Sequence, residues 1–205
     1  MMHVRFSQIT ADPPVLAGCI GYLEDEARSV LESQHGSLGL ALLEEPGVVI
    51  FESFWATHEA LWLSEETEAV FRGELARRVE RPVKAEDYQV TVFEREGPPG
   101  EAVRLMRMQV KPAGVADVVD VYGDSAVPRL VGTLGFRETL LFADVADGQL
   151  ISQTGWRDPA ARAASPSVAE MIRSDVLADD DCQIRTVEDY RLVFDSARKP
   201  GPAWW

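Results

Sequence analysis

Apolar and polar residues alternate at the start of the chain and then recur at helical spacing. Residues 4–10 alternate, which predicts a strand. Asp12, Pro13 and Pro14 follow as a capping residue and two prolines suited to a first helical turn. Apolar residues then recur every three or four positions up to Gly36, which predicts a helix that ends there in a left-handed conformation.

The rest of the first hundred residues predicts two more strands, a helix and a final strand. Residues 38–43 and 48–55 are apolar runs joined by a turn that contains Pro46 and Gly47. A helix is predicted over residues 58–79 and a strand over residues 88–93. The order β-α-β-β-α-β is that of the ferredoxin-like arrangement, in which four antiparallel strands carry two helices on one face.

The second half repeats this order of elements. The predicted elements are a strand at 103–110, a helix at 112–131, strands at 135–144 and 149–156, a helix at 159–176 and a strand at 190–194. We expect Pro128 to kink or end the first of these helices, because a proline inside a helix removes a hydrogen bond and clashes with the preceding turn.

Four short motifs occur in both halves in the same order. The pairs are Val4-Arg5-Phe6 with Val103-Arg104-Leu105, Gly36-Ser37-Leu38-Gly39 with Gly132-Thr133-Leu134-Gly135, Trp55 with Trp156, and Glu86-Asp87-Tyr88 with Glu188-Asp189-Tyr190. Their offsets are 99, 96, 101 and 102 residues. A period of about 100 residues is a normal domain size, so the pattern predicts two similar domains fused in one chain.

These motifs set the expected domain boundaries. The first unit covers residues 1–96 and the second covers residues 102–195. Residues 97–101 form a short linker stiffened by Pro98 and Pro99. Residues 196–205 form a tail that ends in Trp204 and Trp205.

The composition is that of a globular protein with a strongly acidic balance. Hydrophobic residues make up 46% and charged residues 26% of the chain, and the formal net charge is −14. Such a surface repels phosphate backbones and anionic lipid, so we expect neither nucleic acid nor a membrane as a partner. No apolar run approaches the roughly 18 residues that span a bilayer, which favours a cytoplasmic protein.

Cysteine and histidine suggest neither a disulfide framework nor a metal site. Cys19 and Cys182 do not occupy matching positions of the repeat, and Cys19 falls on the apolar side of a predicted helix. No pair of histidine or cysteine residues has ligand-like spacing, so no metal is expected. His58 is interpreted as an exposed residue of a first helical turn.

Several motifs carry a resemblance to a known family. In the second half these are Val110-Lys111-Pro112-Ala113-Gly114, Gly135-Phe136-Arg137, Trp156 and Ala164-Ser165-Pro166, and in the first half Gly39-Leu40, Trp55 and Leu63-Ser64-Glu65. The pattern resembles the dimeric α/β-barrel superfamily, and within it the antibiotic-biosynthesis-monooxygenase-like domains.

The resemblance implies an α+β fold in which two ferredoxin-like β-α-β-β-α-β units pack sheet to sheet as an intramolecular dimeric α/β barrel. Family members pair the open faces of two four-stranded sheets and hold a pocket in each unit between the sheet and the helices. The duplicated chain would do this internally, as a pseudo-dimer, and further homo-oligomerisation stays open. An apolar sheet face without helices also needs such a cover on physical grounds.

The resemblance also suggests a chemistry, which includes cofactor-independent oxygenation of aromatic polyketides and haem degradation. The haem-degrading branch needs an asparagine, and this chain has none, so no cofactor is expected. We expect a small apolar or aromatic ligand whose oxyanion is stabilised by hydrogen-bond donors. The candidate donors are the indole groups of Trp55 and Trp156, the hydroxyls of Tyr88 and Tyr190, and the guanidinium groups of Arg107 and Arg157.

Structural interpretations of the same residues stand beside this one. The two tryptophans are most simply explained as core or interface plugs, and Arg107 as a partner of an acidic residue at the barrel rim. The alternative hypothesis is therefore a non-catalytic ligand-sequestering or assembly module without an active site. The first hypothesis predicts a void of roughly 300 Å3 or more lined by Trp156, Arg107 and Tyr190. Because the second unit keeps the fuller family pattern, we expect a working pocket within residues 101–195.

Overall fold

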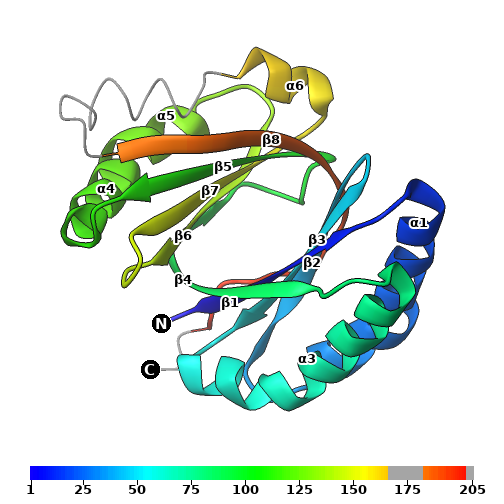
Figure 1. The fold of residues 1–205 in the computed structure, drawn as a ribbon. Coiled ribbons are helices and arrows are strands. Elements are labelled where there is room, and N and C mark those ends of the chain that lie inside the picture. The colour runs from blue at the N-terminus through cyan, green and yellow to red at the C-terminus, as the bar shows by residue number, and fades with distance from the viewer. Residues whose placement is uncertain (166–181, 202–205) are drawn as a thin grey trace. The chain divides into compact units, whose positions relative to one another are not determined.

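A computed structural model of the chain describes residues 1–165 and 182–201 (Figure 1). Residue contacts divide the chain into two units, one made of Met1–Gln89 with Leu192–Trp205 and the other of Val90–Arg191. The expected boundary at residues 97–101 lies between two strands, whereas the contact boundaries fall inside strands. The last strand of each repeat therefore begins in one unit and continues into the other.

The first unit has the expected order of elements. They are β1 (His3–Thr10), α1 (Pro13–Tyr22), a π-helical turn η1 (Leu23–Ala27), α2 (Arg28–Glu32), β2 (Ser37–Glu45), β3 (Val48–Trp55), α3 (His58–Val79) and β4 (Lys84–Arg95). Antiparallel pairing gives the strand order β4-β1-β3-β2, and α1 and α3 lie on one face of this sheet (Figure 1). This is the ferredoxin-like arrangement.

Apolar residues of the sheet and helices form the core of this unit. Leu16, Cys19, Leu23 and Leu31 from the helices are fully buried against alternate residues of the strands, such as Leu40. The prediction that Cys19 is a core residue is therefore confirmed. Such burial of complete leucine side chains contributes about 2 kcal/mol each before the entropy cost of ordering them.

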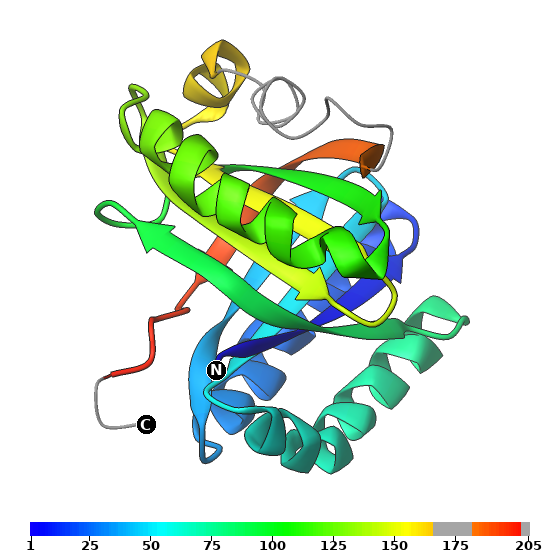
Figure 2. The same ribbon diagram turned by 90° about the vertical axis from the view of Figure 1, so that its left-hand side faces the viewer.

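The second unit repeats the arrangement. Its elements are β5 (Ala102–Val110), a 3-10 turn η2 (Pro112–Gly114), α4 (Val115–Val121), a π-helical turn η3 (Tyr122–Ala126), α5 (Val127–Val131), β6 (Phe136–Asp144), β7 (Gln149–Trp156), α6 (Pro159–Ala164) and β8 (Cys182–Asp195). The strand order β8-β5-β7-β6 matches that of the first unit, and α4, η3 and α5 run along the sheet of this unit (Figure 2).

Hydrogen bonding orders all eight strands in a closed barrel, β1-β3-β2-β8-β5-β7-β6-β4. This confirms the α+β barrel with two ferredoxin-like repeats. The strands β4 and β8 are long, with 12 and 14 residues, because each belongs to both contact units. The strand predicted at 88–93 covers only the middle of β4, and the strand predicted at 190–194 covers only the C-terminal end of β8.

The structure corrects the alignment of one repeated motif. The carbonyl of Gly36 accepts a hydrogen bond from Ala56, and that of Gly135 accepts one from Arg157, so Gly36 corresponds to Gly135 and not to Gly132. The offset is therefore 99 residues through the β2 and β6 strands and 101 after the hairpin turn, which is longer in the second unit. The similar residues that begin at Gly132 follow the end of α5 and do not occupy the equivalent position.

Two further helix predictions are met only in part. The helix does not end at Pro128 but continues to Val131, and the π-helical turn that precedes Pro128 has a counterpart without proline in the first unit. The helix predicted over residues 159–176 begins at Pro159 and is interrupted after Ala164, and residues 166–176 of this prediction lie outside the described residues. Ser165 is extended, with ψ 146°, because a following proline disfavours the helical conformation of the residue before it.

Gly36 and Gly135 hold equivalent and constrained positions. Their φ angles are +81° and +87°, in the left-handed region that favours glycine. A Cβ at either position would come within 2.6 Å of the Cβ of Ala60 or Ala161, respectively. These glycines therefore let the second helix of each unit pack closely on the turn that precedes the second strand.

In the part of the chain that the structure describes, no helix has the length and apolar character needed to cross a membrane.

Candidate functional site

The sheet of the first unit places Trp55 and Tyr88 on opposite faces. Trp55 lies on the face that carries the helices, is fully buried, and donates from its indole nitrogen to Ser53 Oγ at 3.1 Å. Tyr88 pairs across the strands with Val4 on the other face and donates to Glu86 at 2.9 Å. A ligand on one face of this sheet could therefore contact only one of the two residues.

The second unit shows the same division. Trp156 packs with the helix-side core and donates to Thr154 Oγ1 at 3.1 Å. Tyr190 and Arg107 lie on the opposite face, where the Tyr190 hydroxyl donates to Glu188 and Arg107 Nε lies 3.9 Å from the same carboxylate. The structure thus brings Arg107 and Tyr190 together but places Trp156 on the other face of the sheet, so the three residues do not line one side of it.

The remaining predicted donor lies beyond the strand. Arg157 follows Trp156, has a half-exposed side chain and pairs with its neighbour Asp158 at 2.7 Å. His58 is exposed in the first turn of α3, as expected, and its ring contacts that of His3 with centroids 5.4 Å apart. Among the described residues, no group of three or more His, Cys, Asp and Glu side chains is arranged to hold a metal ion.

The helix-side layer of the first unit contains a buried ion network that sequence reasoning missed. Arg5 of β1 makes two hydrogen bonds, at 2.6 and 2.8 Å, to the carboxylate of Asp87 on β4. It also lies 2.5 Å from Glu65 and 3.8 Å from Glu68, both on α3. The Arg5 side chain is only 6% exposed, so these carboxylates compensate a charge that would otherwise be costly to bury.

Glu68 is the centre of this network. It accepts hydrogen bonds from Ser53 at 2.7 Å and Ser64 at 3.2 Å, and Arg72 lies 3.5 Å away. Burial raises the pKa of Glu68, against the lowering effect of Arg5, Ser53 and Arg72. Because Ser53 also accepts from the Trp55 indole, the network continues to the tryptophan and occupies the layer between sheet and helix, where the resemblance predicts a pocket.

The second unit keeps the strand pair but changes the helix. Arg104 of β5 bonds to Asp189 of β8 at 2.9 and 3.4 Å, which repeats the Arg5–Asp87 pair. The fourth residue of the helix is Arg162 in place of Leu61, and its Nε lies 3.4 Å from Asp189. The Arg104 side chain is 22% exposed, against 6% for Arg5.

The charge of the cluster is reversed between the units. Among residues 1–165 and 182–201, the first unit gathers two arginines and three carboxylates, whereas the second gathers Arg104 and Arg162 around one carboxylate, that of Asp189. Along the sequence, the positions of Glu65 and Glu68 are taken by Pro166 and Ala169, which carry no charge. Counted over the residues that the structure describes, the helix-side cluster of the second unit is formally positive, in a chain with a net charge of −14.

Buried hydroxyl groups line the adjacent sheet of the second unit. The Tyr122 hydroxyl lies 2.5 Å from Thr139 Oγ1 and 2.7 Å from Ser152 Oγ. Thr139 pairs across the strands with Thr154, the hydrogen-bond partner of Trp156. Burial raises the pKa of Tyr122, against the lowering effect of its two partners, and favours its neutral form.

The equivalent positions of the first unit are apolar. By the corrected offsets, Leu23, Leu40 and Phe51 stand where the second unit has Tyr122, Thr139 and Ser152. The second unit has therefore replaced large apolar side chains of the sheet by small hydroxyl residues next to its tryptophan.

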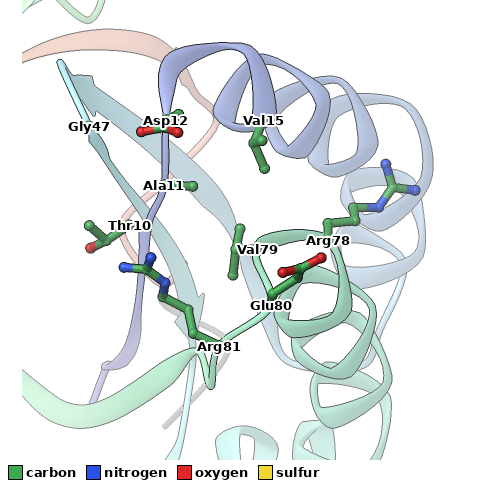
Figure 3. A pocket seen from close by; sticks show the side chains of 9 residues that line it. All are labelled: Thr10, Ala11, Asp12, Val15, Gly47, Arg78, Val79, Glu80 and Arg81. Atoms are coloured by element: carbon green, nitrogen blue, oxygen red, sulfur yellow. The ribbon is translucent and has the colours of Figure 1, made fainter.

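A surface pocket of about 510 Å3 lies elsewhere in the first unit (Figure 3). It is at the end of β1 farthest from Trp55, since His3 pairs with Trp55 and Thr10 with Val48. Its lining is of mixed charge and contains none of the predicted site residues; it consists of Thr10, Ala11, Asp12, Val15, Gly47, Arg78, Val79, Glu80 and Arg81. This pocket is therefore separate from the layer around Trp55.

Comparison with known proteins identifies the fold. No family model matches the chain, and no curated protein matches it either. Several solved structures, however, are similar to it in fold. A candidate monooxygenase from Lactobacillus acidophilus NCFM is 13% identical and has a TM-score of 0.70, with 96% of this chain and 94% of that chain covered. The chain has the dimeric α/β-barrel fold of monooxygenase-like proteins.

Two further solved structures share this fold. An anthrone oxidase-like protein is 15% identical, with a TM-score of 0.64 over 98% of this chain and 96% of that chain. A ferredoxin-fold protein related to antibiotic biosynthesis monooxygenases, from Listeria monocytogenes 4b F2365, is 9% identical, with a TM-score of 0.54 over 93% of this chain and 95% of that chain. At these identities the likeness concerns the monooxygenase-like barrel fold and no particular residue.

Proposed function

We propose that this monooxygenase-like barrel binds a small, anionic aromatic compound in the helix-side layer of its second unit. The observation that carries the proposal is the difference between the two repeats at equivalent positions. The first unit fills this layer with the carboxylates of α3, whereas the second offers Arg104 and Arg162 beside Trp156. A ligand oxyanion would take the role that Glu65 and Glu68 have in the first unit.

The groups around the cluster suit an aromatic ligand. Trp156 supplies an aromatic surface, and the hydroxyl groups of Tyr122, Thr139 and Ser152 supply polar contacts at low dielectric. Arginine guanidinium groups recognise carboxylate or phenolate oxygens in a fixed geometry. Arg107 and Tyr190 are on the other sheet face and are not part of the proposed site, and Arg157 is outside it.

A thermal-shift screen with matched ligand pairs tests the binding. We expect 1-naphthoate and hydroxylated anthraquinones to raise the melting temperature, and the uncharged 1-naphthamide to raise it much less. A ligand at 100 times its dissociation constant stabilises the folded state by about 2.7 kcal/mol. The variant Arg162→Leu, which restores the residue of the first unit, should abolish the shift, whereas Arg157→Leu should keep it. Equal shifts for naphthoate and naphthamide, or full binding by Arg162→Leu, would contradict the proposal.

Oxygenation is the reaction that this site would support. Cofactor-independent oxygenation requires a site that stabilises an electron-rich aromatic anion and keeps bulk water away from it. We expect oxygen uptake only with bound polyphenols whose phenolate form can itself reduce dioxygen, none with 1-naphthoate, and loss of the uptake in Arg104→Gln. If the ligands bind without any oxygen uptake, the alternative of a ligand-sequestering barrel replaces the oxygenase, and the binding site stands.

A further inference from the structure

The outer face of α3 exposes three large apolar side chains. Trp62, Leu63 and Val70 are 67%, 61% and 67% exposed. At 3.6 residues per turn they fall within an arc of about 100° on the helix surface. The opposite face of the same helix buries Leu61 and Leu75 against the unit. The exposed stripe is therefore a second apolar face, which marks an interaction surface on a folded domain.

A glycine lies on this outer face. Gly73 is exposed within α3, six residues before the helix ends at Val79, and no atom lies within 4 Å of the position of an added Cβ. Glycine is the least favourable residue after proline in a helix interior, and no turn or cap requires it there. The missing side chain of Gly73 leaves a hollow on the apolar stripe. A large side chain from another helix would fit this hollow, as a knob fits a hole in a coiled coil.

Charges at the two ends of the stripe are opposite. Glu59 lies in the first turn of α3, and Arg77 lies in the last turn with a 74% exposed side chain. Two copies of α3 packed antiparallel about an axis at Glu68 would place Glu59 of each copy opposite Arg77 of the other. The same register brings Trp62 to within one residue of the position opposite Gly73.

We infer that α3 is a self-association surface through which two copies of this chain form a two-fold symmetric dimer. The surface is complementary to itself in shape, through Trp62 and Gly73, and in charge, through Glu59 and Arg77, as a two-fold interface requires. A pair of single helices is smaller than a standard interface, so we expect a weak dimer with a dissociation constant on the order of 10–100 µM. The inference is independent of the proposed ligand site.

One residue of the stripe opposes the association. Glu66 is two residues from the axis, so the two copies of Glu66 would be about 6 Å apart along the helices. Like charges at this distance repel each other. The variant Glu66→Gln should therefore tighten the dimer several-fold.

Sedimentation equilibrium of the full chain from 5 to 500 µM at about 0.15 M salt measures the association. We expect Glu59→Arg and Arg77→Glu each to weaken the dimer at least tenfold, and the double variant Glu59→Arg/Arg77→Glu to restore it. Glu24→Arg and Arg81→Glu make the same changes of net charge outside the stripe and should leave the dissociation constant within about twofold. A wild-type chain that stays monomeric at 500 µM, or a double variant as weak as the single ones, would overturn the inference.

Gly73→Gln separates the dimer from the stability of the helix. The substitution fills the hollow with a good helix former, so it should raise the melting temperature of the monomer while it weakens the dimer. Trp62→Ala should weaken the dimer as well, whereas Leu134→Ala, which removes another exposed apolar side chain, should not. An unchanged dissociation constant in Gly73→Gln and Trp62→Ala would show that α3 is not the interface.

Discussion

In both repeats an arginine pairs with an aspartate on the neighbouring strand, but the residues that surround the pair differ. Arg5 faces Asp87 in the first unit and Arg104 faces Asp189 in the second, in directly opposite positions of neighbouring strands. In the first unit, carboxylates of α3 complete the pair and bury it. In the second, a further arginine joins the pair, and the cluster gains a positive charge for which the described residues supply only one carboxylate.

The ionisation of Glu68 makes a pH-dependent prediction. Burial raises its pKa in the folded protein, so the folded state holds this proton more tightly than the unfolded chain. The stability from protonated Glu68 is present below the unfolded pKa and is lost as the pH rises through the folded pKa. Since glutamine does not ionise, the free energy of unfolding of Glu68→Gln should increase relative to wild type between pH 4 and pH 7, as measured by urea denaturation. A difference that shrinks over this range would mean that Arg5 and Arg72 outweigh the burial of Glu68.

About half of the residues of the candidate site belong to motifs that the sequence repeats. Arg104 and Asp189 belong to repeated motifs, so the repeat itself signalled a conserved pairing of opposite charges between the first and last strands of each unit. Trp156 was identified directly. Arg162, Tyr122 and Ser152 were missed because nothing in a single sequence shows which helix residue meets which strand.

At the scale of elements, hydrophobic periodicity predicted most helices and strands closely. The helix over residues 58–79 and the strand over residues 149–156 have the predicted bounds. Which residues of different strands share a sheet face was harder to predict, because a single sequence does not give the pairing register. In places β-bulges also shift the register between strands. Such irregularities occur between Ser37 and Gly39, between Phe136 and Glu138, and between Arg107 and Met108. An irregularity of this kind moves the following side chains to the other face.

The contact between Gly36 and α3 gives a second prediction. Gly36→Ala should destabilise the protein by about 2 kcal/mol or more, because the residue has a left-handed φ and its new Cβ would overlap that of Ala60. The double variant Gly36→Ala/Ala60→Gly should recover the part due to the overlap. Gly47→Ala is the control, since Gly47 has φ +91° but nothing within 4 Å, and it should cost only about 1 kcal/mol. Chemical denaturation that gives equal losses for Gly36→Ala and Gly47→Ala would contradict this packing account.

At the scale of the whole molecule, the division of the chain does not follow the repeat. Residues 192–195 of β8 belong with the first unit, where Val193 and Phe194 pack against its core. The segment after β8 continues this contact, since the Ser196 and Arg198 amides donate to Leu40 and Leu38. Gly39 permits the close approach, because a Cβ there would lie 2.2 Å from the Ser196 carbonyl oxygen.

Strands that belong to both units should make unfolding cooperative. We expect a single calorimetric transition with a van't Hoff enthalpy equal to the calorimetric one, because loss of either unit removes part of a strand from the other. Truncation after Arg191 should lower the melting temperature by more than 5 °C and keep one transition. Two resolved transitions in the intact chain would show that the repeats fold independently.

In our proposal the second repeat binds the ligand, while the first has filled its own layer with an ion network. A crystal structure of the chain with a ligand found by thermal shift distinguishes the two repeats. We expect ligand density beside Trp156, with an anionic oxygen of the ligand within hydrogen-bond distance of Arg104 or Arg162. Density next to Trp55 in the first unit, or on the sheet face of Arg107 and Tyr190, would contradict it.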